Sequence, residues 1–123
     1  EELYQIFQVS ASEYWQTHYN FDKVSPKKAK SLSKSFIDLL IINTIIPFRF
    51  AYEKSLGKET IEENIAFLEK ITAEKNTIID KFKTIGIASK NAFETQSLLQ
   101  LKKEYCDKSK CLQCAVGLEL LKN

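Results

Sequence analysis

The sequence predicts an all-α fold, an irregular antiparallel bundle of about six helices, and three observations support this prediction. Apolar residues recur at intervals of three and four, as in Ile61, Ile65 and Leu68. Only three glycines and two prolines occur in 123 residues, which leaves few positions for turn-rich loops. No run of alternating apolar and polar residues is long enough to indicate a strand.

The predicted helices are joined by short connections, which favours antiparallel packing of neighbours. They cover residues 2–8 with 11–20, 26–56 with a break near Pro47, 60–71, 76–85, 91–105 and 110–122. Residues 1–123 are expected to form a single helical domain, since this length is sufficient for an apolar core without disulfides.

Helix starts and stops are indicated by residue type. Three starts show a capping side chain three positions before a glutamate: Ser10 with Glu13, Thr60 with Glu63, and Asn91 with Glu94. Ser25 followed by Pro26 indicates a further start, because proline needs no amide partner at the first helical position. Gly57 and Gly86 are expected to end helices, since glycine adopts the left-handed conformation at low cost.

The most apolar segment is "SFIDLLIINTIIPFRFAY", residues 35–52. Polar residues interrupt it, among them Asp38 and Arg49, so a buried helix is expected in place of a membrane span. Pro47 removes a backbone donor and crowds the carbonyl of Asn43, which predicts a kink or break there. The side chain of Asn43 is expected to hydrogen-bond backbone groups freed by the proline.

Arg49, the one arginine of the chain, lies just after Pro47 in this apolar segment. A guanidinium in such surroundings requires an acceptor. Asp38 and Glu53 are the candidate partners, and a structural ion pair is the favoured interpretation.

Three cysteines lie close together in "YCDKSKCLQCAVG", residues 105–117, and the chain has no others. Cys106, Cys111 and Cys114 form a C-x4-C-x2-C pattern in which the first thiol ends one predicted helix and the other two begin the next. Thiolates at a helix N-terminus are favoured by unpaired amides, and lysines at 108 and 110 add positive charge. A C-x2-C step is typical of zinc sites and iron–sulfur clusters.

A closed zinc site needs four ligands, and this loop provides three. His18 is the only histidine and the one candidate in the chain for the fourth position. Alternatively the fourth ligand lies upstream of this sequence, or a three-thiolate cluster leaves one iron open.

Two other interpretations of the cysteines involve no metal. Cys111, Cys114, Leu118 and Leu121 share a helical face, which is the pattern of packed core thiols, with an adventitious disulfide as a variant. This interpretation is favoured narrowly over the metal site. The less favoured one is a redox switch that uses Cys111 and Cys114.

Aromatic and lysine clusters allow two interpretations each. The run "EYWQTHYNF", residues 13–21, is able to stack bases or contact a partner, but helical spacing favours packing within the fold. Lysines cluster at residues 27–34 and 102–110, where they would hold phosphates or form a solvated helix surface. The solvated surface is favoured, because lysine lacks the flat fork with which arginine clamps phosphate.

Composition excludes several classes of protein. The net charge is +2, from 18 basic and 16 acidic residues, so the overall field attracts no polyanion strongly. No phosphate-binding glycine loop, nucleophile elbow or metalloprotease motif is present, and no enzymatic activity is expected.

An odd cysteine count without an export signal predicts a cytoplasmic protein, and the start at Glu1 suggests a fragment.

Four segments carry a family resemblance: "EYWQTHYNF", "IDLLIINTIIPFRFAY", "AEKNTIIDKFKTIGI" and "NAFETQSLLQLKKEYCDKSKCLQCAVG". Together they resemble the C-terminal part of a bacterial family catalogued as domain-of-unknown-function family 2851, whose members are larger proteins mostly from Bacteroidetes. The similarity extends over nearly all of the chain and is most specific in the NTIIP segment and the cysteine loop. The resemblance implies a bacterial cytoplasmic protein. It carries no implication about activity.

The favoured function is therefore that of a non-catalytic helical C-terminal domain with a structural or interaction role, whose partner is the N-terminal region of the same protein. The alternative is a zinc- or iron–sulfur-binding accessory domain of a nucleic-acid-processing enzyme, with Cys106, Cys111 and Cys114 as ligands and His18 as the fourth. The loop is similar to the cluster loops of some DNA glycosylases and nucleases, although those use four cysteines at other spacings. No membrane contact is expected.

Overall fold

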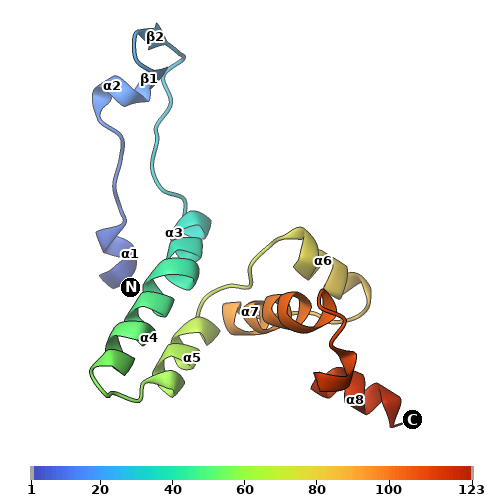
Figure 1. Ribbon diagram of the computed structural model, residues 1–123. Coiled ribbons are helices and arrows are strands. Elements are labelled where there is room, and N and C mark those ends of the chain that lie inside the picture. The colour runs from blue at the N-terminus through green and yellow to red at the C-terminus, as the bar shows by residue number, and fades with distance from the viewer. Residues whose placement is uncertain (1, 123) are drawn as a thin grey trace. The chain divides into compact units, whose positions relative to one another are not determined.

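The computed structural model describes residues 2–122, except for the side chain of Leu120, and is largely helical (Figure 1). The all-α prediction is confirmed, with the addition of one small two-stranded sheet. The chain forms two compact units, residues 1–47 and 48–123. That residues 1–123 form a single helical domain remains a prediction.

The first unit contains short helices, a hairpin and the start of a long helix. Its elements are α1 (Glu2–Ile6), α2 (Glu13–Gln16), β1 (His18–Asn20), β2 (Lys23–Val24), α3 (Lys34–Leu40) and the π-helical segment η1 (Ile41–Ile45). Helix α4 (Ile46–Ser55) follows η1 without interruption and continues into the second unit.

The predicted helix over residues 11–20 is wrong beyond Gln16. Strands β1 and β2 pair antiparallel there, with His18 opposite Val24. Asp22 makes the turn with a φ of 60°, a left-handed conformation that aspartate tolerates better than most residues. The predicted cap at Ser10 is also wrong, since Ser10 bridges Ser31.

The predicted start of the next helix at Ser25-Pro26 is eight residues too early. Helix α3 begins after Ser33, whose hydroxyl accepts a hydrogen bond from the amide of Phe36 at 3.2 Å. Residues 25–30 are extended instead, and they exchange backbone hydrogen bonds with residues 11–17. The amides of Ser25 and Lys28 thus find carbonyl partners without forming a helix.

The sequence predicted a kink or a break at Pro47, and the helix is not broken there. The turn before it is the π segment η1, in which the amide of Ile46 donates to the carbonyl of Ile41, five residues earlier. The wider turn accommodates the missing donor and the bulk of the proline ring. The Asn43 side chain donates to the carbonyl of Leu39 at 3.0 Å, one turn earlier, and not to a carbonyl freed by the proline as predicted.

The helix over Lys34–Ser55 is long and apolar enough to cross a membrane, judged by length and composition alone. The core helix of a soluble protein meets the same criteria. Of its most apolar window 28% is buried, including Ile37, Ile41 and Ile46, whereas Phe48 is exposed. The prediction of a buried helix therefore holds only for the face of this helix that carries Ile37, Ile41 and Ile46.

The second unit packs two helices against a third. Its elements after α4 are α5 (Ile61–Glu69), α6 (Thr77–Thr84), α7 (Ala92–Leu101), the π segment η2 (Lys102–Cys106), the 3-10 turn η3 (Cys111–Gln113) and α8 (Ala115–Leu121). Helices α5 and α6 both contact α7. Ile71, Ile79, Ala92 and Thr95 are buried in this unit.

Several helix ends of the second unit follow the sequence signals. Asn91 accepts a hydrogen bond from the amide of Glu94 at 2.9 Å, and the Glu94 carboxylate accepts from the amide of Lys90, one residue before the expected partner. Gly57 and Gly86 end helices with φ values of 72° and 89°, as predicted. These signals act within a few residues, so the sequence is sufficient to reveal them.

Candidate functional site

The cysteine loop joins three short elements at the end of the second unit. Cys106 ends η2, Cys111 begins η3, and Cys114 precedes α8. All three are free thiols, of which Cys106 and Cys111 are exposed and Cys114 is buried. The predicted buried stripe is wrong for Cys111, Leu118 and Leu121, which are exposed.

The loop is not assembled as a metal site in this structure. Within residues 2–122, no group of three or more His, Cys, Asp or Glu side chains is placed so that it could hold a metal ion. His18 lies in the first unit, where its Nδ1 is 2.9 Å from the carbonyl oxygen of Tyr14 and 3.0 Å from the hydroxyl of Thr17. The metal ligands proposed from the sequence therefore remain a prediction without structural support.

Gly117 positions the cysteine loop against α8. A Cβ atom on Gly117 would lie 2.3 Å from the carbonyl oxygen of Cys111, a distance that real Cβ atoms essentially never show. Backbone thus approaches backbone here, and glycine is the residue that permits the contact. The amide of Leu118 completes the arrangement by donating to the carbonyl of Cys114 at 2.8 Å.

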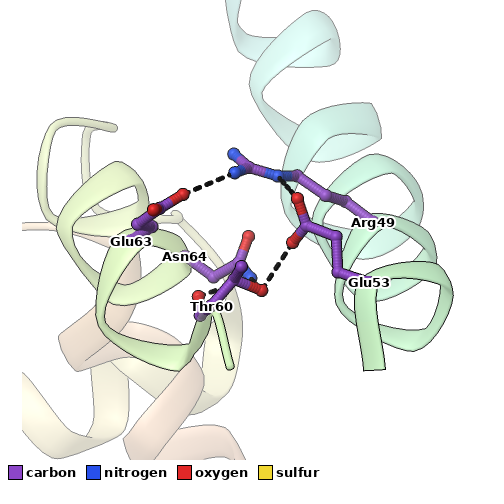
Figure 2. A network of polar contacts seen from close by, with 5 residues as sticks. All are labelled: Arg49, Glu53, Thr60, Glu63 and Asn64. Carbon is purple, nitrogen blue, oxygen red and sulfur yellow. Dashed lines mark hydrogen bonds and ion pairs between the residues drawn. The ribbon is translucent and has the colours of Figure 1, made fainter. Parts of the chain in front are cut away.

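A polar network centred on Arg49 connects α4 to α5 (Figure 2). The Arg49 Nε donates to Oε1 of Glu53 at 2.9 Å, and its Nη2 donates to Oε2 of Glu63 at 2.8 Å. Glu53 was one of the two predicted partners, and Glu63 was not foreseen as one. The guanidinium thus binds one carboxylate on each helix.

Thr60 extends the network in a role that the sequence did not suggest. Its hydroxyl donates to Oε2 of Glu53 at 2.5 Å and makes no capping hydrogen bond, although Thr60 occupies the cap position of α5. The side-chain Nδ2 of Asn64, a buried residue, donates to the carbonyl of Thr60 at 2.9 Å. The predicted Thr60–Glu63 capping box is wrong because both side chains bond to α4.

The network shifts the pKa of both central groups. The hydroxyl of Thr60, followed by the guanidinium of Arg49, lowers the pKa of Glu53 below its ordinary value of 4.5. The pKa of Arg49 is raised, chiefly by its hydrogen bond to Glu53. Both groups are therefore charged throughout the neutral range, and the network is suited to holding α4 on α5 and not to proton transfer.

Replacing Glu53 by glutamine is expected to reduce the loss of unfolding free energy that occurs as the pH falls into the acid range. A carboxylate whose pKa is lowered by folding contributes stability that is present above about pH 4.5 and is lost as the pH falls toward the native pKa. Urea unfolding measured between neutral pH and pH values below 4.5 should show a shallower decline for Glu53→Gln. Glu62→Gln, an exposed change on the first turn of α5, should leave the slope as in the parent protein.

A second polar group lies in the first unit, between α1 and α3. The hydroxyl of Tyr4 donates to Oδ1 of the buried Asp38, and Lys34 Nζ lies 3.3 Å from Oδ2 of the same carboxylate. Tyr4 and Lys34 also line a hollow of about 680 Å³, together with Gln5, Gln8, Leu32 and Ile37. A buried carboxylate with two donors is a satisfied structural group that attaches α1 to α3.

Burial, with a smaller contribution from the hydrogen bond to Asp38, raises the pKa of Tyr4 from 10.0 to about 12. The stability contributed by this phenol is complete below pH 10 and is lost as the pH rises toward 12. Near-ultraviolet titration should therefore show a late phenolate step that belongs to Tyr4. Tyr4→Phe should remove that step, and Tyr52→Phe, an exposed control, should retain it.

A comparison with known families gives one result. Residues 1–77 match the family model described as "Protein of unknown function (DUF2851)", which is 77 of the 123 residues and more than half of the chain. The matched range includes the NTIIP segment, residues 43–47, and ends before the cysteine loop. No curated protein and no solved structure matches.

Proposed function

This chain belongs to the DUF2851 family of proteins of unknown function, and we propose that it is a non-catalytic helical module that contacts other protein segments. The two polar clusters of the structure, around Arg49 and around Asp38, each join a pair of helices within one unit. Their geometry supports a structural role. The interaction role is supported by a different observation, the exposure of apolar side chains near the C-terminus.

The end of the second unit exposes large apolar residues on consecutive turns. The exposed fractions are 73% for Leu112, 55% for Val116, 44% for Leu118 and 63% for Leu121. The principal contact of α8 within the described part of the chain is the adjoining turn η3. Glu119 is the only charged residue between positions 111 and 121.

A surface of this composition favours a protein partner. A concentration of exposed apolar side chains in a short segment is typical of an interaction site, because excluding water from them on binding yields about 25 cal/mol per Å². We propose that this chain is part of a larger protein and that the partner of this surface is another segment of that protein. Residues 112–121 would then pack on that segment as an ordinary helix-to-domain contact.

Site-specific photocrosslinking in the longer protein tests this proposal. A photoreactive amino acid at Val116 should form a crosslink to a segment outside this chain, and mass spectrometry should identify the segment. The matched control carries the same group at Lys83, an exposed position on α6, and should not form that crosslink. Quenching of the Val116 probe by water alone would contradict the docking role.

The alternative function, a metal-binding accessory domain, is supported only by the spacing of Cys106, Cys111 and Cys114. Its test is the metal content of anaerobically purified protein. Stoichiometric zinc or iron that disappears in Cys111→Ser would establish this alternative. Substoichiometric metal, equal in the parent and in Cys111→Ser, would remove it.

A further inference from the structure

The hairpin of the first unit exposes aromatic rings that the fold leaves uncovered. Tyr19 is 62% exposed, Phe21 is 75% exposed, and Val24 on the second strand is 77% exposed. Isolated apolar residues on a surface need no explanation, but three large exposed apolar side chains within seven residues are a local concentration. We call residues 18–24 the aromatic hairpin.

The Phe21 ring is exposed and yet held in position. It contacts Trp15 edge-on, with ring centroids 5.1 Å apart at 67°, and Tyr14 at 6.4 Å. Tyr14 in turn stacks on His18 at 4.0 Å with an angle of 3°. The ring of Phe21 is thus preorganised by aromatic neighbours while most of its surface faces solvent.

The Tyr19 ring is positioned by a cation. The Nζ of Lys30 lies 3.5 Å from the ring centroid and donates to the carbonyl of His18 at 2.6 Å. This contact occupies one side of the ring, and a 62% exposed fraction leaves room for a second planar group.

Lysines are concentrated in the hairpin and in the segment that follows it. The extended residues 25–30 run along α2, where the amide of Lys28 donates to the carbonyl of Gln16 at 2.8 Å. The side chains of Lys23 and Lys27 are exposed, as is that of Lys28. Residues 18–30 contain four lysines and one aspartate, a net charge of 4 − 1 = +3, whereas the entire chain carries +2.

From these observations we infer that the aromatic hairpin and its lysines form a binding site for single-stranded nucleic acid. Exposed, fixed rings next to cations match the chemistry of a single strand, in which bases stack and phosphates accept positive charge. Tyr19 and Phe21 would each stack on a base, and Lys23, Lys27 and Lys28 would contact phosphates. This inference is independent of the docking role of residues 112–121.

An anionic membrane is the competing partner for a surface of rings and lysines. Insertion of Phe21 into lipid would carry Asn20 and Asp22 with it, because they flank Phe21 in the turn. Moving a carboxylate toward hydrocarbon is costly. Base stacking leaves Asp22 in water, and the turn therefore favours a nucleic acid.

Fluorescence anisotropy with labelled single strands of about 12 nucleotides tests the inference. Oligothymidylate and oligouridylate arms separate DNA from RNA, and a duplex of equal length should bind more weakly. With three phosphate contacts, the logarithm of affinity should fall against the logarithm of salt concentration with a slope of about −2. Double substitution of Lys27 and Lys28 by glutamine should reduce that slope by about 1.4.

Ring variants test the stacking contacts. Phe21→Ala should weaken binding by roughly 5- to 150-fold, and Phe21→Trp should retain it. Phe36→Ala, an exposed aromatic of α3 in the same unit, is the matched control and should bind as the parent does. Equal binding by parent and Phe21→Ala, an unchanged salt slope in the lysine variant, or a preference for phosphatidylglycerol vesicles over oligonucleotides would each overturn the inference.

Discussion

Replacing Ile41 by alanine is expected to lower the free energy of unfolding by about 2–5 kcal/mol. Ile41 is fully buried, with an exposed fraction of 0%, at the first position of the π segment. The change removes buried methyl groups and leaves a cavity, and both effects destabilise the protein. Since domains of this size are stable by about 5–15 kcal/mol, the loss is a large part of the total.

Urea unfolding followed by far-ultraviolet circular dichroism measures this effect. Leu39→Ala is the matched control, because Leu39 lies on the same helix with 44% of its surface exposed. Leu39→Ala should lower the free energy of unfolding by less than about 1 kcal/mol. Equal costs for the two variants would show that the side of the helix at Ile41 is not a core position.

The second large effect is expected for Gly117→Ala. Alanine is a better helix former than glycine by about 1 kcal/mol, which alone would stabilise α8. Its Cβ would, however, lie 2.3 Å from the carbonyl oxygen and 3.0 Å from the carbonyl carbon of Cys111, and backbone atoms cannot move aside as a side chain can. The overlap is expected to dominate and to separate η3 from α8.

The buried thiol reports this separation. In the parent protein a thiol reagent should modify two cysteines, Cys106 and Cys111, quickly and Cys114 slowly. In Gly117→Ala the reaction of Cys114 should become at least about tenfold faster, since Cys114 lies between the two elements that are expected to separate. Val116→Ala, a change at the neighbouring exposed position, should leave all three rates unchanged. A slow third thiol in Gly117→Ala would contradict the close contact.

The helices were predictable because their signals are local. Apolar spacing, the Asn91 cap and the glycines at 57 and 86 each involve residues within one or two turns. Of the two outcomes predicted at Pro47, a kink or a break, the break does not occur. A wider turn just before it admits proline without ending the helix, and nothing in the residue types distinguishes that turn from an ordinary one.

The polar partners were less predictable because each residue has several possible ones. Thr60 followed by Glu63 matches a capping box, yet both side chains bond to residues of α4 once α5 packs beside it. The pairing of Tyr4 with Asp38 spans 34 positions and has no sequence signal at all. For the cysteines, spacing was compatible with a metal site, a packed stripe or a redox pair, and the structure buries one thiol and exposes two.

The sequence by itself determined that this chain is built of helices and where most of them begin and end, because turn-by-turn hydrogen bonding and capping depend on near neighbours. The tertiary structure decided which polar groups meet and which apolar groups stay in water. Arg49 binds two glutamates, Cys114 is buried, and Phe21 and Leu112 remain exposed. Burial depends on what packs from elsewhere in the chain, and residue spacing does not encode it.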